Sequence, residues 1–137
     1  MANMVVARCA DGRTVKGNSL DVDPTRPRCH VRTAEGEMVD VALDDLKALF
    51  FVKSLDGDSS HVEGSEIAPD DARMRGARLI EVTFADGEKL VGLSTRFPPN
   101  KKLFFLVPVD TASNNVRILV NERHIASMAP LPVPPAA

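Results

Sequence analysis

The fold is decided by Val6-Ala-Arg-Cys-Ala-Asp11-Gly12-Arg-Thr-Val15-Lys-Gly17, which recurs 75 residues later as Glu81-Val-Thr-Phe-Ala-Asp86-Gly87-Glu-Lys-Leu90-Val-Gly92. The two Asp-Gly pairs fall on one another, and so do the two later glycines. Asp-Gly between apolar runs is a strong hairpin signal, because tight turns need a positive φ that glycine adopts without steric cost. This ordered series of matching turn residues indicates an internal repeat.

The repeat continues beyond the first hairpin. Pro24 falls on Pro99 at the same offset, and after a two-residue slip residues 39–45 lie over residues 116–122 at an offset of 77. A short helical turn is expected near the end of each copy, begun by Asp44 in the first and by Asn121 in the second. Each copy is predicted to have five strands: 4–9, 14–20, 28–32, 38–42 and 48–52, then 79–84, 89–94, 103–107, 115–120 and 125–128.

The predicted fold class is therefore all-β, with two tandem small five-stranded β-barrel modules related by the internal repeat. Their strand order resembles that of Sm-like barrels, although no Sm sequence signature is present. The first module is expected at residues 1–53 and the second at residues 78–129. Residues 54–77 are predicted to be a polar exposed linker with a short helical turn after Pro69. Residues 130–137 contain four prolines, which indicates a disordered or extended tail.

Composition narrows the classes of function. The chain has 137 residues, 44% of them hydrophobic, and a net charge of −2, which is the balance of an ordinary globular protein. Residues 1–75 carry ten Lys and Arg against fourteen Asp and Glu, whereas residues 76–137 carry seven against five. A dedicated duplex-binding protein would be more basic. No secretory signal or membrane-spanning stretch is recognised, so a cytoplasmic location is expected.

No catalytic, metal or cofactor site is predicted. The three histidines, His30, His61 and His124, are far apart and none lies in a metal-binding spacing. Cys9 and Cys29 lack a Cys-x-x-Cys spacing, so we interpret them as buried free thiols. No nucleophile elbow and no phosphate-binding glycine loop is present. A non-enzymatic protein is expected.

One string resembles a known family. Residues 44–57, Asp-Asp-Leu-Lys-Ala-Leu-Phe-Phe-Val-Lys-Ser-Leu-Asp-Gly, together with Gly17, Asp21 and Pro24, are similar to a bacterial domain of unknown function with a Leu-Lys-Ala-x-Phe-Phe-Val-Lys signature. The resemblance covers residues 4–57 well and the second copy in outline. It implies a regulatory or interaction module and transfers no catalytic residues.

Two kinds of binding surface remain open. Phe50-Phe51 and Phe104-Phe105 place adjacent rings on a strand, so the rings of each pair point to opposite faces. One ring can fill a core and the other needs a cover, which makes these four residues a candidate protein interface. The cover could be the sister module, a second copy of the chain or another protein. The sequence thus favours an adaptor whose partner is another protein or a second copy of the same chain.

The alternative is a binder of an anionic ligand, a cyclic dinucleotide or RNA. One candidate anion site is the cluster of Arg73, Arg75 and Arg78, which precedes a strand as arginines do in PilZ-like barrels. In those barrels the arginines are accompanied by a strand with the motif Asp/Asn-x-Ser-x-x-Gly, and that motif is absent from this sequence. Another candidate is the loop with Arg96, Lys101 and Lys102. Proteins that bind single strands usually stack bases on aromatic rings, and few such rings lie near this loop in the sequence. Nucleic acid or nucleotide is the less favoured partner.

Overall fold

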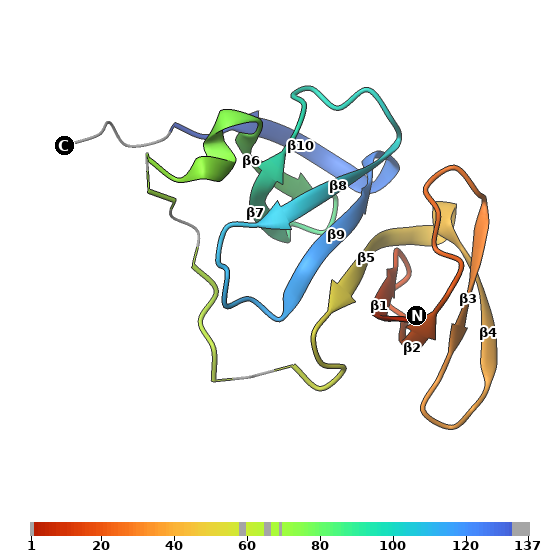
Figure 1. Ribbon diagram of the computed structural model, residues 1–137. Helices are drawn as coiled ribbons and strands as arrows, with labels where there is room; N and C mark the ends of the chain where they lie inside the picture. The colour runs from red at the N-terminus through yellow and green to blue at the C-terminus, as the bar shows by residue number, and fades with distance from the viewer. Residues whose placement is uncertain (1, 58–59, 65–66, 69, 133–137) are drawn as a thin grey trace.

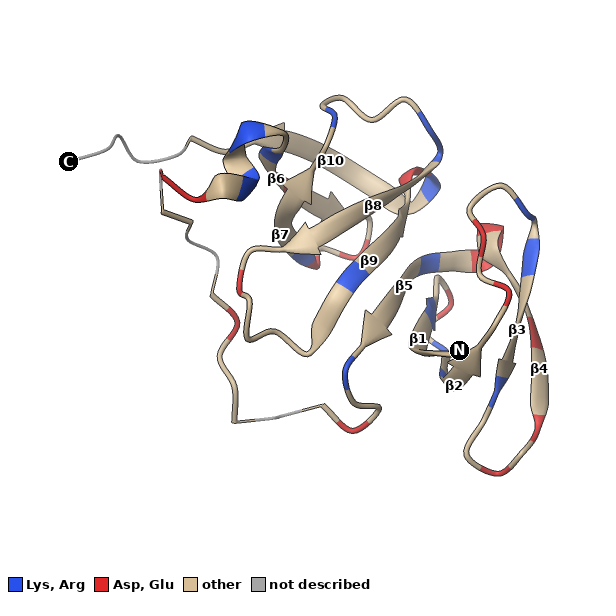
Figure 2. Cartoon of the chain, in the orientation of Figure 1, with Lys and Arg blue, Asp and Glu red and all other residues tan. Residues whose placement is uncertain are grey.

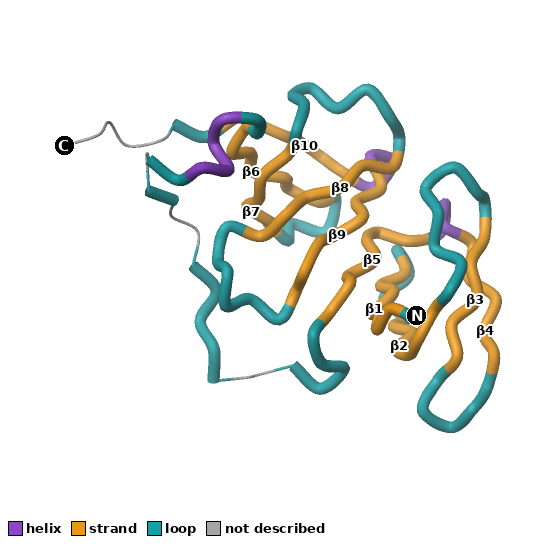
Figure 3. The backbone as a smooth tube through the Cα atoms, viewed as in Figure 1, coloured by secondary structure: helices purple, strands orange, loops and turns teal. Residues whose placement is uncertain are grey.

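The computed structural model describes residues 2–57, 60–64, 67–68 and 70–132. These residues form an all-β protein in which short 3-10 turns interrupt the strands (Figures 1 and 3). The 3-10 turns are η1 (Leu43–Asp45), η2 (Ala72–Arg75) and η3 (Glu122–His124). The strands are β1 (Asn3–Cys9), β2 (Thr14–Ser19), β3 (Arg28–Arg32), β4 (Met38–Ala42), β5 (Leu46–Val52), β6 (Arg78–Phe84), β7 (Lys89–Ser94), β8 (Leu103–Pro108), β9 (Asn115–Asn121) and β10 (Ile125–Pro130).

All ten strands belong to one antiparallel sheet, in the order β10-β6-β7-β8-β9-β5-β1-β2-β3-β4. The two copies meet where β5 pairs with β9, and Figure 1 shows these strands side by side in the middle of the molecule. In the described residues β4 and β10 form the two ends of this order and do not pair with each other. The all-β expectation is confirmed, and the strands form one open sheet because the last strand of the first copy pairs into the second. That each copy is a small barrel of its own stays a prediction.

The strand ladders repeat with the sequence. Val5 pairs with Gly17 in the first copy and Ile80 pairs with Gly92 in the second, which preserves the offset of 75 residues. Even the register shift recurs, in the pairing of β1 with β5 and of β6 with β10. The strand order is also the same, β5-β1-β2-β3-β4 and β10-β6-β7-β8-β9. We call residues 3–52 the first repeat and residues 78–130 the second repeat.

The offset of 77 expected for the later strands is wrong by two residues. Val41 pairs with Cys29, and its counterpart Val120 pairs with Phe104. The offset in β4 and β9 is therefore 79, and the β8–β9 connection carries a longer insertion. A further two-residue slip keeps the same side chains on the same face, because side chains alternate with a period of two.

Two large hydrophobic clusters form the core, and β5 contributes to both. Leu49 and Phe51 pack with Val5 and Val31 of the first repeat, whereas Phe50 packs with Ile80 of the second. Every residue of β5 is buried, because its two faces pack into the two clusters. Its two edges are paired with β1 and β9. A strand buried on both faces is typically a continuous apolar run, which Leu46–Val52 is apart from Lys47.

The turn before β5 differs from its predicted form. Asp44 lies inside η1 and does not cap it; the N-cap is Ala42, without a side-chain hydrogen bond. Asn121 does cap the equivalent η3, because its side chain accepts a hydrogen bond from the Arg123 amide. The two copies therefore use the same turn with different capping.

Parts of the linker and of the tail pack against β6 of the second repeat. Ile67 is 6% exposed and packs with Leu79 of β6, and η2 lies in the segment where a helical turn was predicted. β10 continues to Pro130, and the Leu131 amide donates to the Leu79 carbonyl. The remainder of the predicted tail, residues 133–137, lies outside the described residues. None of the helical turns in the described part of the chain has the length and apolar character that spanning a membrane would require.

Candidate binding groove between the repeats

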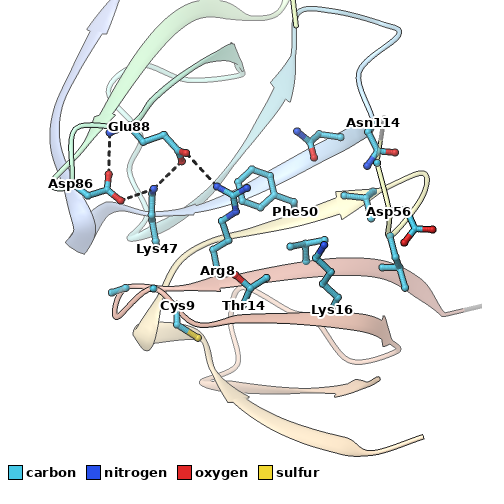
Figure 4. Close-up of a pocket in the computed structure, with 17 residues that line it drawn as sticks. Arg8, Cys9, Thr14, Lys16, Lys47, Phe50, Asp56, Asp86, Glu88 and Asn114 are labelled. Carbon is cyan, nitrogen blue, oxygen red and sulfur yellow. Dashed lines mark hydrogen bonds and ion pairs between the residues drawn. The ribbon is translucent and has the colours of Figure 1, made fainter. Parts of the chain in front are cut away.

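A groove of about 600 Å³ lies where the two repeats meet. Its apolar residues are Val6 of β1, Phe50 and Val52 of β5, and Leu55 after β5. Figure 4 shows charged and amide side chains around them, from β1, β2, β5, the β6–β7 turn and the β8–β9 loop. We call this site the inter-repeat groove.

A four-residue charge network closes one end of the inter-repeat groove. Lys47 Nζ lies 2.8 Å from Asp86 Oδ2 and 2.8 Å from Glu88 Oε1. Arg8 Nη1 lies 3.2 Å from Glu88 Oε2. The network joins β1 and β5 of the first repeat to the turn between β6 and β7 of the second (Figure 4). The ion pairs hold the two repeats together at this end of the groove. The two cations balance the two carboxylates, so the network carries no net charge.

Lys47 is the most buried member of the network, with a side chain 11% exposed. Burial disfavours its charge, but hydrogen bonds to Asp86 and Glu88 outweigh burial and raise the pKa of Lys47. The same hydrogen bond lowers the pKa of Asp86, with help from the Glu88 amide. Both groups are therefore ionised at neutral pH, and the ion pair persists there.

Two cations also cover aromatic rings near the groove. The Arg8 guanidinium lies 5.2 Å from the centre of the Phe50 ring, and Lys47 Nζ lies 4.7 Å from the centre of the Phe84 ring. Such contacts orient the cation over the ring face. Arg8 is half-exposed, so it forms a solvent-facing wall of the groove above Phe50.

The lining of the groove combines an apolar part with polar side chains. Its apolar part can receive a hydrophobic side chain, and Lys16, Asn114 and Asn115 supply donors and acceptors beside it. Cys9 also lines the groove, but burial raises the pKa of its thiol. A protonated thiol is a poor nucleophile, and no histidine lies among the described lining residues.

The four phenylalanines predicted as an interface lie on both sides of the joint. Phe50 and Phe104 belong to the cluster of the second repeat. Phe51 belongs to the cluster of the first repeat, and Phe105 packs against that cluster. Arg117 covers the outer side of this contact, with its guanidinium 4.3 Å from the Phe51 ring centre and 4.6 Å from that of Phe105.

The first predicted anion cluster lies away from the groove. Arg73 is committed to structural contacts, with hydrogen bonds to Asp71 and to the carbonyls of Pro108 and Val109. Asp71 raises the pKa of Arg73 through the hydrogen bond between them. Arg75 and Arg78 are exposed, and neither lines the groove.

Two of the three residues in the second predicted anion cluster line the same pocket. Lys101 and Lys102 line a pocket of about 540 Å³ together with Arg26 of the first repeat, whereas Arg96 does not line it. Lys102 pairs with Asp44, which also pairs with Arg123. These cations hold the pKa of the Asp44 carboxyl below its ordinary value, the hydrogen bond from Lys102 foremost. We call this the basic pocket.

Sequence reasoning missed the residues that shape the groove, namely Arg8, Lys16, Lys47 and Glu88. One signal was available: Lys47 is the only charged residue within the apolar run of β5. A cation in a buried strand requires a partner, but the sequence does not reveal that the partners lie in the other repeat. Figure 2 shows that acidic and basic residues are dispersed along the whole chain.

The chain belongs to a family of unknown function, DUF6982, whose model matches residues 1–131. The match spans both repeats, and thus extends beyond the residues 4–57 on which the sequence resemblance rests. Comparisons with curated proteins and with solved structures give no match.

Proposed function

We propose that this protein is a non-enzymatic adaptor that binds an extended segment of a partner protein in the inter-repeat groove. On this proposal each repeat is a small, partly open barrel, and the joint between the barrels provides the binding surface. The observation that carries the proposal is the groove itself, with apolar residues between polar and charged walls. Its volume of about 600 Å³ is in the range of about 300–1,000 Å³ typical of ligand sites.

The composition of the walls supports a peptide as the ligand. Val6, Val52 and Leu55 offer contacts to one or two apolar side chains, and the Asn114 and Asn115 amides line the groove. Asn114 already bonds the chain at Ser54 through both its amide nitrogen and its oxygen, so its position is well defined. Main-chain amides of a peptide match donors and acceptors of this kind.

The experiment compares two charge reversals at exposed lysines. A peptide library is selected on the parent protein, and the dissociation constants of the selected peptides are then measured with Lys16→Glu and Lys101→Glu. Lys16 lines the inter-repeat groove and Lys101 lines the basic pocket. We expect Lys16→Glu, and likewise Thr14→Arg at the exposed groove wall, to weaken peptide binding about tenfold, the effect of losing about 1.4 kcal/mol. Lys101→Glu should leave it unchanged.

Either of two results would contradict the proposal. The first is the absence of any selected peptide that binds the parent protein in solution. The second is binding that survives Lys16→Glu and Thr14→Arg unaltered in variants with unchanged melting temperatures.

A second candidate function is binding of an anionic ligand at the basic pocket. It is favoured by one observation: Arg26, Lys101 and Lys102 converge there over Leu43 and Leu103, with Asp44 as the acidic lining residue. The lining thus carries more positive than negative charge. Titration with a fluorescent dinucleotide tests it, since Lys101→Glu should abolish that binding and Lys16→Glu should not. Absence of dinucleotide binding to the parent protein, or binding indifferent to Lys101→Glu, would exclude this candidate.

A further inference from the structure

Three potential metal ligands meet on the surface of the second repeat. His61 and Glu63 lie in the linker, and Asp110 lies in the β8–β9 loop. One ligand atom from each lies within 4.8 Å of the other two. His61 Nε2 is 2.8 Å from Asp110 Oδ2, and the two side chains are 30% and 17% exposed.

The Asp110 carboxylate is held in a defined orientation by the backbone. Its Oδ2 accepts a hydrogen bond from the Gly64 amide at 3.0 Å, and its Oδ1 accepts one from the Ala112 amide at 2.9 Å. These two amides, one on each carboxylate oxygen, fix the plane of the Asp110 carboxylate beside His61. Groups behind a ligand that fix its orientation are a regular feature of metal sites.

The loop that carries Asp110 is the place where the two repeats differ most in length. More residues separate the last paired residue of β8 from the first paired residue of β9 than separate the corresponding residues of β3 and β4. This longer loop binds residues on the linker side of β5: Asn114 bonds Ser54, and the Thr111 carbonyl accepts from Lys53 Nζ. Asp110 extends the same attachment to His61 and Gly64.

A small cavity of about 230 Å³ is lined by two of the three ligands, His61 and Glu63. Its other polar lining residues are Ser113, Asn114, Asn115 and Lys53, whose Nζ donates to the Thr111 carbonyl. A cavity with these polar walls has room for a water molecule to complete the coordination of an ion.

We propose that His61, Glu63 and Asp110 bind a Zn²⁺ ion that fastens the linker to the β8–β9 loop. Imidazole with two carboxylates suits zinc, whereas calcium and magnesium prefer ligand sets made only of oxygen. Zinc takes His nitrogen and carboxylate oxygen at about 2.0–2.2 Å, so the ion would replace the direct hydrogen bond between His61 and Asp110. None of the three ligands lines the inter-repeat groove or the basic pocket, although Asn114 and Asn115 line both the groove and the small cavity.

The test is calorimetric titration of the metal-stripped full chain with zinc chloride. We expect one zinc ion per chain, and at least about a tenfold loss of affinity in His61→Ala and in Glu63→Gln. The matched control is His30→Ala, because His30 also pairs with an aspartate, Asp21, but belongs to no group of three ligands among the described residues. Cobalt substitution separates this site from the thiols, since a thiolate ligand would add a charge-transfer band.

A readout independent of affinity is hydrogen exchange. Zinc should slow amide exchange at Gly64 and Ala112 in the parent protein and not in His61→Ala. The proposal fails if the parent chain binds no zinc, or if the affinity is the same in His61→Ala and Glu63→Gln as in the parent. It also fails if a thiolate band shows that Cys9 or Cys29 is the ligand.

Discussion

The side-chain amide of Asn121 donates a hydrogen bond to the Leu46 carbonyl at 3.0 Å, from the end of β9 in the second repeat to the start of β5 in the first. It donates another to the Asp44 carbonyl at 3.1 Å, and its oxygen accepts from the Arg123 amide. Asn121 is fully buried. This one side chain therefore satisfies polar backbone groups of both repeats at the joint.

Asn121→Ala should lower the free energy of unfolding by about 1–3 kcal/mol, because it leaves buried carbonyls without donors. Asn121→Asp should be at least as harmful, since a carboxylate cannot donate to those carbonyls. Urea denaturation measures both, with Asn18→Ala, at an exposed position of β2, as the control. An Asn121→Ala variant as stable as Asn18→Ala would show that water replaces the amide.

Gly17→Ala should destabilise the protein more than Gly92→Ala does at the equivalent position. A Cβ on Gly17 would lie 2.0 Å from the Arg32 carbonyl oxygen, whereas one on Gly92 would lie 3.0 Å from the Val107 carbonyl oxygen. The backbone of β3 has to move in the first case, which costs about 1–3 kcal/mol by analogy with overpacking. Thermal unfolding of the two variants checks the order, and equal melting temperatures would contradict it.

The His30 imidazole should titrate above its ordinary pKa of 6.5. Its hydrogen bond with Asp21 raises the pKa of His30 and lowers that of Asp21 to about 2. The stability from His30 is present below pH 6.5 and is lost as pH rises through its raised pKa. The stability from Asp21 is present above its ordinary pKa of 3.8 and is lost as pH falls towards 2.

NMR titration of the imidazole checks this prediction. Asp21→Asn should return the His30 pKa towards 6.5, whereas Asp40→Asn, which removes a weaker electrostatic contribution, should shift it less. A larger effect of Asp40→Asn would mean that the hydrogen bond is not the main cause.

The joint between the repeats should not form between separate chains. Equivalent positions at the free edges lack its key side chains: Ala129 of β10 corresponds to Phe50, and Asp40 of β4 corresponds to Leu119. Pro130 also removes a donor from β10, and charge and proline on edge strands oppose edge pairing. We expect light scattering to give the monomer mass of 14.8 kDa.

A matched gain-of-function variant makes the same prediction testable in the other direction. Asp40→Leu with Ala129→Phe should raise the mass in a concentration-dependent manner, because it recreates two apolar contacts of the joint. A parent chain that already assembles through β4 would contradict the prediction, and Asp40→Lys would then lower its mass.

The local structure was largely predictable from the sequence. Gly12 and Gly87 both have positive φ, at 96° and 92°, as the Asp-Gly hairpin turns predict, because such turns depend on neighbouring residues alone. The offset of the later strands was not predictable. Offsets of 77 and 79 residues differ by two, so both place the same apolar side chains on the same face of the strand. Only the ladder of β8 with β9 distinguishes them.

The sequence by itself determined that the chain is all-β, that it is a repeat, and that neighbouring phenylalanines point to opposite faces. These follow from turn chemistry and from the period of two along a strand. Only the tertiary structure decided that β5 pairs with β9, that Phe50 and Phe51 serve different cores, and that Lys47 meets Glu88. Those contacts join residues far apart in the chain, and their energy depends on which surfaces the folded repeats bury together, which no local pattern records.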